Sequence, residues 1–378
     1  MDRIVTCLSP NGTRETQGAS PASRLLVATL KGVTRLERDD ARASWRVVAQ
    51  SLADLHIGAL VYEPKSGKLF AGAHRDGGLW VSDDGAGESW RRIAADLDRQ
   101  HMYSLAAQDR GDHVVLWLGT EPAGLYRSDD LGETWRELSG IYKVDDTDKW
   151  TFPPPPHIAH VKDITFHPAE PATIYVCIEQ GALLKSTDDG ETWRELTDYS
   201  KEDDVAYRDT HRVTLHPTNP RELYMATGEG LYGSADGGAH WTHLTTPQHR
   251  VGYPDFLFFD SADARTIYMG GAARGPRYWR EKPVSDAAVV KSSDGGRSWT
   301  LLDQGLPHPA VGSFEAMALH RWPGGRMLFV GTATGEVYAS DNGGASWTEI
   351  ARELAPISKD GHYRPFLPSE QQRRVAHA

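Results

Sequence analysis

Short apolar stretches of three to five residues recur along the whole chain, and Gly, Pro and Asp bound them. One unit shows the pattern well, because residues 164–166, 173–177, 183–185 and 193–196 are four such stretches in succession. Runs of this length between turn residues predict β-strands rather than helices. Four strands in each unit is the pattern of a blade in a β-propeller.

A turn motif lies before the last strand of each unit. It is a serine, an acid or amide two residues on, a glycine two after that and a closing tryptophan, as in Ser128, Asp130, Gly132 and Trp135. The acid can bond amides of its own turn, and glycine accepts a positive φ. The tryptophan is large enough to fill the space between neighbouring blades. The seven closing residues, 45 to 58 positions apart, are Trp45, Trp90, Trp135, Trp193, Trp241, Trp299 and Trp347.

Seven units with a period near fifty residues predict an all-β fold, a seven-bladed β-propeller of four-stranded antiparallel blades. We expect one propeller over residues 1–355 and a C-terminal tail over 356–378, poorly ordered at its end. The first blade is predicted from residues 4–8, 24–29, 33–37 and 45–49, with 11–23 as a mobile polar loop. The ring should then close by side-chain packing between the first and last blades, unless the tail adds a strand.

The turn motif resembles the Asp-box repeat of bacterial neuraminidases, and the resemblance covers nearly the whole chain. It implies the sialidase-like propeller superfamily, which also includes polysaccharide hydrolases, lyases and photosystem II assembly propellers. A true sialidase would carry a Phe/Tyr-Arg-Ile-Pro segment near its start and six blades. Here the early segment reads Ser23-Arg24-Leu25-Leu26, and seven units are present. Because the box lies far from the active site in that superfamily, it indicates the fold and not the chemistry.

Composition narrows the setting of the protein. Of 378 residues, 39% are hydrophobic and 25% charged, and the net charge of −11 argues against a nucleic-acid or anionic-membrane partner. No run approaches the roughly 18 apolar residues that a membrane span needs, and the first residues do not resemble a signal peptide. Only Cys7 and Cys177 occur, which suits a reducing compartment. We therefore expect a cytoplasmic protein.

Three consecutive units place a histidine at the entrance of the innermost strand, namely His56, His101 and His160. Equivalent positions on adjacent blades point toward a common axis, so these side chains predict a site for one divalent metal such as Zn, Mn, Ca, Ni or Cu. No organic cofactor is implied. A polar channel lined by histidine and water would need no metal. The matching positions in the later units are Asp209, with His211 after it, and Gly252 and Gly312, followed by Asp255 and Glu315.

Acidic, aromatic and arginine side chains gather at the same predicted mouth. Glu121, Glu179 and Glu229 fall in turns between the second and third strands, with His74 near the matching place in blade two. Two long insertions, residues 140–156 and 272–286, extend connections on this face and suggest a ligand rim, although long loops can also be plain insertions. The predicted substrate-binding set is Arg274, Trp150, Trp279, Tyr142, His74 and Glu179.

These observations predict an enzyme, a hydrolase or lyase that acts on a small anionic or carbohydrate-like substrate at the mouth of the channel. The predicted catalytic set is Asp209, His211, Glu315 and Glu121. A hydrolase of glycosides needs two carboxyl groups, and a metal-assisted lyase needs a base and a cation. Seven-bladed lyases of the oligogalacturonate type hold a divalent ion with histidines in the channel. This chain resembles them in its channel histidines alone. Two alternatives stay open: a non-catalytic scaffold that binds a protein partner, and a carbohydrate-binding lectin that uses Trp150 and Trp279.

Overall fold

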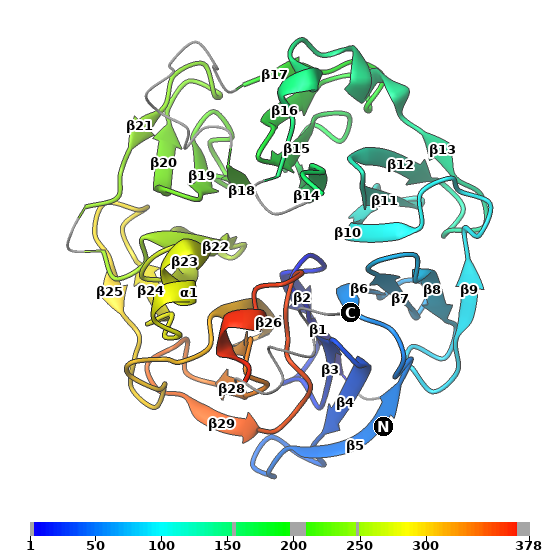
Figure 1. The fold of residues 1–378 in the computed structure, drawn as a ribbon. Helices are drawn as coiled ribbons and strands as arrows, with labels where there is room; N and C mark the ends of the chain where they lie inside the picture. Colours follow the sequence, from blue (N-terminus) through cyan, green and yellow to red (C-terminus); the bar gives the residue numbers. More distant parts are fainter. Residues whose placement is uncertain (1–3, 153–155, 197–208, 247–248, 369–378) are drawn as a thin grey trace.

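The computed structural model describes residues 4–152, 156–196, 209–246 and 249–368. Within these residues the strands form seven sheets arranged in a ring around a central axis (Figure 1), which confirms the predicted seven-bladed propeller. Blades two to six are antiparallel sheets of four strands in sequence order, with the first strand at the axis and the last at the perimeter.

The strands of the first three blades have the following bounds. Blade one contains β1 (Val5–Leu8), β3 (Arg24–Thr29), β4 (Gly32–Glu37) and β5 (Arg46–Ser51). Blade two contains β6 (Ile57–Glu63), β7 (Lys68–Ala73), β8 (Gly78–Ser82) and β9 (Arg91–Ile93). Blade three contains β10 (His101–Asp109), β11 (Val114–Glu121), β12 (Gly124–Ser128) and β13 (Arg136–Glu137).

The remaining blades follow the same order. Blade four contains β14 (His160–Phe166), β15 (Ile174–Glu179), β16 (Ala182–Ser186) and β17 (Arg194–Glu195). Blade five contains β18 (Thr210–Leu215), β19 (Leu223–Thr227), β20 (Gly230–Ser234) and β21 (Thr242–His243). Blade six contains β22 (Tyr253–Asp260), β23 (Asp263–Ala272), β24 (Ala288–Ser292) and β25 (Thr300–Leu301). Blade seven contains β26 (Phe314–Trp322), β27 (Gly325–Thr332), β28 (Val337–Ser340) and β29 (Thr348–Ala351).

Helices are short and lie in the connections. They are α1 (Pro276–Glu281) and the 3-10 helices η1 (Ser139–Lys143), η2 (Thr147–Lys149) and η4 (Arg364–Phe366). No helix in the described part of the chain is long and apolar enough to span a lipid bilayer.

The repeated turn motif has the local bonding that its residue types predict. In blade three, Ser128 Oγ donates to Asp130 Oδ1 at 2.8 Å, and the Gly132 amide donates to Ser128 Oγ at 2.8 Å. Trp135 Nε1 donates to the Gly132 carbonyl at 3.1 Å, so its ring folds back over the turn. Each of the seven closing tryptophans packs with an apolar cluster that joins two neighbouring blades. The motif is therefore a device that holds blades together.

The N-terminal segment closes the ring in a way that the sequence did not indicate. Residues 11–23, predicted as a mobile loop, contain strand β2 (Glu15–Gln17), which pairs in parallel with β26 as a fifth strand of blade seven. Strand β1 also runs parallel to its neighbour β3 rather than antiparallel. The expected side-chain packing between the first and last blades is present as well, for example between Leu8 and Phe329.

The C-terminal tail lies on the ring over its described length. Ile357, Ser358 and Lys359 are buried, and the Ile357 amide donates to the Thr332 carbonyl at 3.2 Å. The Leu30 amide donates to the Pro356 carbonyl at 2.9 Å, so the tail contacts the first blade as well as the last. The predicted disordered end, residues 369–378, lies outside the described residues.

Candidate functional site

A β-bulge near the start of the innermost strand recurs in six consecutive blades. In each case the pairing register shifts by one residue, so that the strand contains one extra residue at the axis. The extra residues in blades two to seven are Gly58, Tyr103, Lys162, His211, Asp255 and Glu315. Of these, the five side chains are all buried. The bulges therefore build a layer of polar side chains just below the axial mouth, the end of the channel opposite the Asp boxes.

The bulges also correct the repeat alignment. The bulged residue follows the strand entrance by two positions in blades two to five, where the entrances are the predicted residues. In blades six and seven the same offset gives Tyr253 and Ser313 as the entrances, one residue after the predicted Gly252 and Gly312. A bulge cannot be read from apolar periodicity, so the repeat alignment missed this shift.

The side chain of His160 is the centre of a buried ionic network. Its Nδ1 lies 3.1 Å from Glu121 Oε2 and its Nε2 lies 2.6 Å from Glu179 Oε2. Burial alone would lower the pKa of His160, but the hydrogen bonds to these two carboxylates raise it above its usual range. Lys162 Nζ donates to Glu179 Oε1 at 2.6 Å and lies 3.4 Å from Asp255 Oδ1. Charges from blades three, four and six thus meet at the axis.

The three predicted metal ligands lie on neighbouring strands of one face, but the structure does not place them as one ligand set. Both nitrogens of His160 are engaged by carboxylates. His56 Nε2 lies 2.7 Å from the Ser358 carbonyl oxygen, and His101 Nδ1 lies 3.3 Å from Glu121 Oε1. Metal binding by this trio would therefore require His160 to give up one of its two carboxylate contacts.

His74 joins these side chains in a ring stack. Its ring centroid lies 4.3 Å from that of His56, 4.8 Å from that of His101 and 5.0 Å from that of Tyr103. Tyr103 in turn stacks on His160 at 3.6 Å. Burial lowers the pKa of His74 well below its usual range, so this imidazole is neutral. His74 is thus a packed member of the axis, whereas the sequence placed it among the groups that contact substrate.

The predicted aromatic rim is only partly at the mouth. Trp279 is 1% exposed and packs against Tyr253 and Phe366, so it holds α1 to the tail and does not offer a surface to a ligand. Tyr142 Oη donates to Glu137 Oε1 at 2.9 Å, which places it beside the outermost strand of blade three and away from the channel. These two positions correct the predicted substrate-binding set.

The other predicted rim residues differ in their exposure to solvent. Arg274 is exposed, with its guanidinium 4.9 Å from the centroid of the Tyr278 ring. Trp150 is partly buried and packs against the apolar cluster between blades three and four. Glu179 is buried in the ionic network. Arg274 and Tyr142 are the exposed members of the predicted substrate-binding set.

Two groups of two carboxylates and one histidine lie in the network. The first acid–histidine group is Glu179, Asp209 and His211, and the second is Asp255, Glu315 and His362. In each group the ligand-type atoms lie within 4.8 Å of one another. The sequence predicted a role for Asp209, His211 and Glu315, but it gave no indication that the tail would bring His362 to the axis.

A lysine from the tail occupies the second acid–histidine group. Lys359 Nζ bonds to Asp255 Oδ1, and its backbone amide donates to Glu315 Oε2 at 3.4 Å. Ser313 Oγ also donates to Glu315 Oε1, and His362 Nδ1 lies 3.3 Å from the same oxygen. Burial alone would raise the pKa of Asp255, but the ammonium groups of Lys359 and Lys162 hold it well below its usual range. The second group is therefore neutralised by the chain itself.

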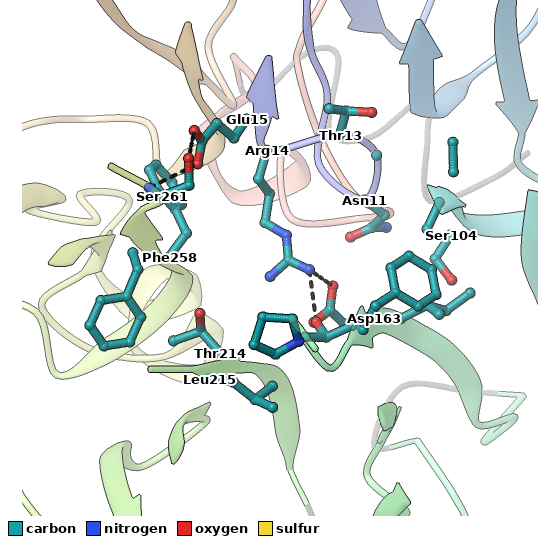
Figure 2. Close-up of a pocket in the computed structure, with 18 of the residues that line it drawn as sticks. Asn11, Thr13, Arg14, Glu15, Ser104, Asp163, Thr214, Leu215, Phe258 and Ser261 are labelled. Carbon is teal, nitrogen blue, oxygen red and sulfur yellow. Dashed lines mark hydrogen bonds and ion pairs between the residues drawn. The ribbon is translucent and has the colours of Figure 1, made fainter. Parts of the chain in front are cut away.

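The other end of the channel holds a cavity of about 430 Å³ on the Asp-box face. The N-terminal segment crosses it, and Figure 2 shows Arg14 reaching toward Asp163, with 3.1 Å between the guanidinium and Oδ1. Glu15 turns toward Ser261, which donates to its carboxylate. Burial raises the pKa of Glu15 and outweighs the bonds that lower it. None of the predicted site residues lines this cavity, because all of them were predicted at the opposite end of the channel.

Comparison with known families finds one partial match. The family model described as Sortilin, neurotensin receptor 3 (Sortilin-Vps10) matches residues 181–310, which is 130 of the 378 residues. The matched span covers the third and fourth strands of blade four, blade five and blade six.

Relatives with known activity match a little over half of the chain. A xyloglucanase from Paenibacillus sp is 25% identical over 235 residues, which cover 52% of this chain and 21% of that protein. The xyloglucanase Xgh74A of Acetivibrio thermocellus is 23% identical over 258 residues, 57% of this chain and 29% of that protein. The chain thus spans less than a third of the length of these two relatives.

Two solved structures agree on the fold. An ancestral GH74 enzyme superposes with a TM-score of 0.57 at 15% identity, over 78% of this chain and 38% of that one. YCF48 bound to D1 peptide gives a TM-score of 0.56 at 16% identity, over 89% of this chain and 95% of that one. Together these comparisons identify a seven-bladed propeller that is similar to GH74 xyloglucanases in sequence and to both an enzyme and a peptide-bound protein in fold.

Proposed function

We propose that the chain is a hydrolase that acts on a carbohydrate-like substrate at the axial mouth. The observation that carries this proposal is the pair formed by Glu121 and His101. Glu121 Oε1 lies 3.3 Å from His101 Nδ1, while His101 Nε2 has no hydrogen-bond partner in the described part of the chain. A carboxylate that holds one nitrogen of an imidazole and leaves the other free is the arrangement of a general base.

Electrostatics favour this role. Burial alone would raise the pKa of Glu121, but hydrogen bonds from His101 and His160 lower it to about 2, so the carboxylate is ionised at neutral pH. An ionised Glu121 favours the tautomer of His101 with its proton on Nδ1, which leaves a lone pair on the buried Nε2. In this proposal a water molecule held at Nε2 gives its proton to that lone pair. The side chains of His101 and Glu121 are 14% and 22% exposed, so the pair lies at the solvent edge of the network.

The opposite side of the mouth would serve the leaving group. Asp209 of blade five is 19% exposed and lies on the far side of blade four from His101. Hydrolysis of a glycoside needs one group that activates water and another that stabilises the departing oxygen. In this proposal Glu121 and His101 activate the water, and the groups around Asp209 stabilise the departing oxygen.

The substrate class rests on the relatives. Both relatives are named xyloglucanases, and the chain matches less than a third of their length. A carbohydrate-like substrate, and membership in the sialidase-like superfamily, therefore belong to this proposal. A second candidate function, peptide binding, is favoured by the buried tail segment at Ser358 and Lys359, which already lies in the mouth as a peptide would.

Activity on a panel of neutral and acidic oligosaccharides would test the proposal. We expect turnover in the wild type and a loss of roughly 10²–10⁴-fold in His101→Ala, the range of general base catalysis. The matched control is His113→Ala, because His113 is exposed beside Asp112 in the turn between β10 and β11. Product analysis separates hydrolysis from elimination, which leaves an unsaturated sugar. Equal turnover of His101→Ala and wild type would refute the assigned base.

A further inference from the structure

The position of the proton on His211 follows from its surroundings. Its Nδ1 lies 2.7 Å from the carbonyl oxygen of Pro254. A carbonyl can only accept, so Nδ1 must carry a hydrogen and donate it. A backbone carbonyl that fixes one nitrogen of an imidazole in this way is the usual partner behind a metal-ligating histidine. In the neutral imidazole the other nitrogen, Nε2, then carries no hydrogen and presents its lone pair.

The lone pair of His211 faces two carboxylates. Nε2 lies 3.4 Å from Asp209 Oδ1 and 3.6 Å from Glu179 Oε1. Both separations exceed the 2.7–3.2 Å range of an N–H···O hydrogen bond. The side chain of His211 is 0% exposed, and Nε2 has no hydrogen-bond partner among the described residues. Three electron-rich atoms that face one another in a buried place repel, unless a positive charge lies between them.

The two distances from His211 fit a tetrahedral metal ion, and the oxygens of Glu179 and Asp209 lie within 4.8 Å of each other. Zinc–nitrogen and zinc–oxygen bonds are about 2.0–2.2 Å long, and in a tetrahedron this places neighbouring ligand atoms about 3.3–3.6 Å apart. The two distances from His211 Nε2, 3.4 and 3.6 Å, lie in that range. We propose that the first acid–histidine group, Glu179, Asp209 and His211, binds one divalent cation of the zinc type. Three protein ligands would leave a fourth position open for water or substrate.

Neighbouring side chains hold this site in place. Lys162 Nζ donates to Glu179 Oε1, and His160 Nε2 contacts the other oxygen of the same carboxylate. Such partners orient metal ligands and are needed for affinity. Asp209 is the member that reaches solvent, with 19% of its side chain exposed, so an ion can enter from that side.

The two acid–histidine groups differ in how the chain contacts their carboxylates. In the first group Lys162 contacts Glu179, and no lysine or arginine among the described residues pairs with Asp209, whereas in the second group Lys359 contacts both Asp255 and Glu315. The second group also has two carboxylates and an imidazole, but Lys359 Nζ bonds to Asp255 within it. A buried ammonium supplies the positive charge that a metal would otherwise bring. His362 of that group therefore offers a matched control for the first group.

The proposal of a zinc site does not depend on the proposed hydrolysis. If both are right, the cation would lie on the leaving-group side of the mouth, where a Lewis acid stabilises negative charge on oxygen. Binding of zinc can be measured without any substrate, so failure of one proposal does not decide the other. His101→Ala, which tests hydrolysis, should bind zinc as the wild type does.

Zinc competition against a chromophoric chelator tests the site on the full chain. We expect one ion per chain in the wild type and in His362→Gln. In Asp209→Asn, which keeps the size of the side chain, affinity should fall by more than the roughly 10–100-fold that loss of an outer partner costs. Cobalt(II) gives a second readout, since a tetrahedral site produces intense visible absorption that Asp209→Asn should abolish.

Three outcomes would overturn the site. They are the absence of a bound ion in the wild type, unchanged affinity in Asp209→Asn, and an equal loss in Asp209→Asn and His362→Gln. A folded Asp209→Asn chain, checked by its thermal unfolding, is part of the measurement, and the partly exposed position of Asp209 makes a folded variant the expected case.

Discussion

The two acid–histidine groups at the axial mouth contain the same kinds of side chain but are completed differently. The second group receives the ammonium of Lys359 from the tail, on Asp255. In the first group the ammonium of Lys162 contacts Glu179, and His211 Nε2 faces both carboxylates without a hydrogen-bond partner among the described residues. Burying carboxylates is costly unless a positive charge accompanies them. The comparison therefore separates a structural ion cluster from a binding site within one network.

Removing the lysine should have the largest effect on stability. Lys359→Met removes the closer of the two ammonium groups beside the buried Asp255 and leaves Lys162 at 3.4 Å, and breaking a buried pair in this way costs about 3–5 kcal/mol of unfolding free energy. Urea unfolding at neutral pH measures the loss. Lys65→Met is the control, because Lys65 pairs with Asp109 on the surface and should cost less than about 1 kcal/mol. Equal effects of the two variants would contradict the contrast between the groups.

Added zinc should stabilise Lys359→Met. Without Lys359, the second group has two carboxylates and His362 free to hold an ion, as in the first group. A ligand at a hundred times its Kd stabilises the folded state by about 2.7 kcal/mol. We expect added zinc to raise the unfolding free energy of Lys359→Met by more than that of the wild type. A rise that is equal in both would mean that the lysine does not occupy a potential ion site.

The pH dependence of the unfolding free energy should distinguish the neutral, buried histidines of the ring stack from the charged groups. Burial lowers the pKa of His56 to about 4, whereas an unfolded histidine takes up its proton near 6.5. The unfolded state therefore binds more protons in this window, and stability falls as the pH falls from about 6.5 to about 4. For a shift of this size the loss between pH 7 and 5 is about 2 kcal/mol.

Unfolding at these two pH values in wild type and His56→Gln isolates this contribution. The wild type should lose about 2 kcal/mol more than the variant. His160 acts in the opposite sense, because its raised pKa adds stability that is present below about 6.5 and is lost as the pH rises. A wild type and a variant with the same pH profile would show that His56 is not held neutral by burial.

The smallest effect is expected at the second group's own histidine. His362 is 12% exposed, and its Nδ1 lies 3.3 Å from Glu315 Oε1, which also accepts from Ser313. His362→Gln should lower the unfolding free energy by about 1 kcal/mol or less, the usual net value of one hydrogen bond. A larger loss, close to that of Lys359→Met, would mean that His362 and not Lys359 neutralises this group.

Much of the fold could be predicted because its signals are local. The turn motif of Ser128, Asp130 and Gly132 is bonded within itself, and the closing tryptophans lie between blades as their size suggested. The pairing of β2 with β26 could not be predicted, since it joins Glu15 to Leu319 across the whole chain and leaves no local pattern.

The candidate site was predictable in place but not in detail. Repeat alignment found the mouth and named Asp209 and His211, because the entrance of each innermost strand recurs at a fixed offset. It could not show that a bulge presents Lys162 at the axis, nor that Lys359 of the tail enters the second group. It also placed Trp279 on the rim, whereas packing against Phe366 buries it. Such contacts depend on tertiary structure, which sequence periodicity does not record.

Diffraction from a zinc-soaked crystal, with anomalous scattering recorded at the zinc absorption edge, tests the contrast most directly. The account predicts a peak about 2.0–2.2 Å from His211 Nε2 and from one oxygen each of Asp209 and Glu179. It predicts no peak between Asp255, Glu315 and His362, where Lys359 lies. A peak in the second group, or none in the first, would contradict it.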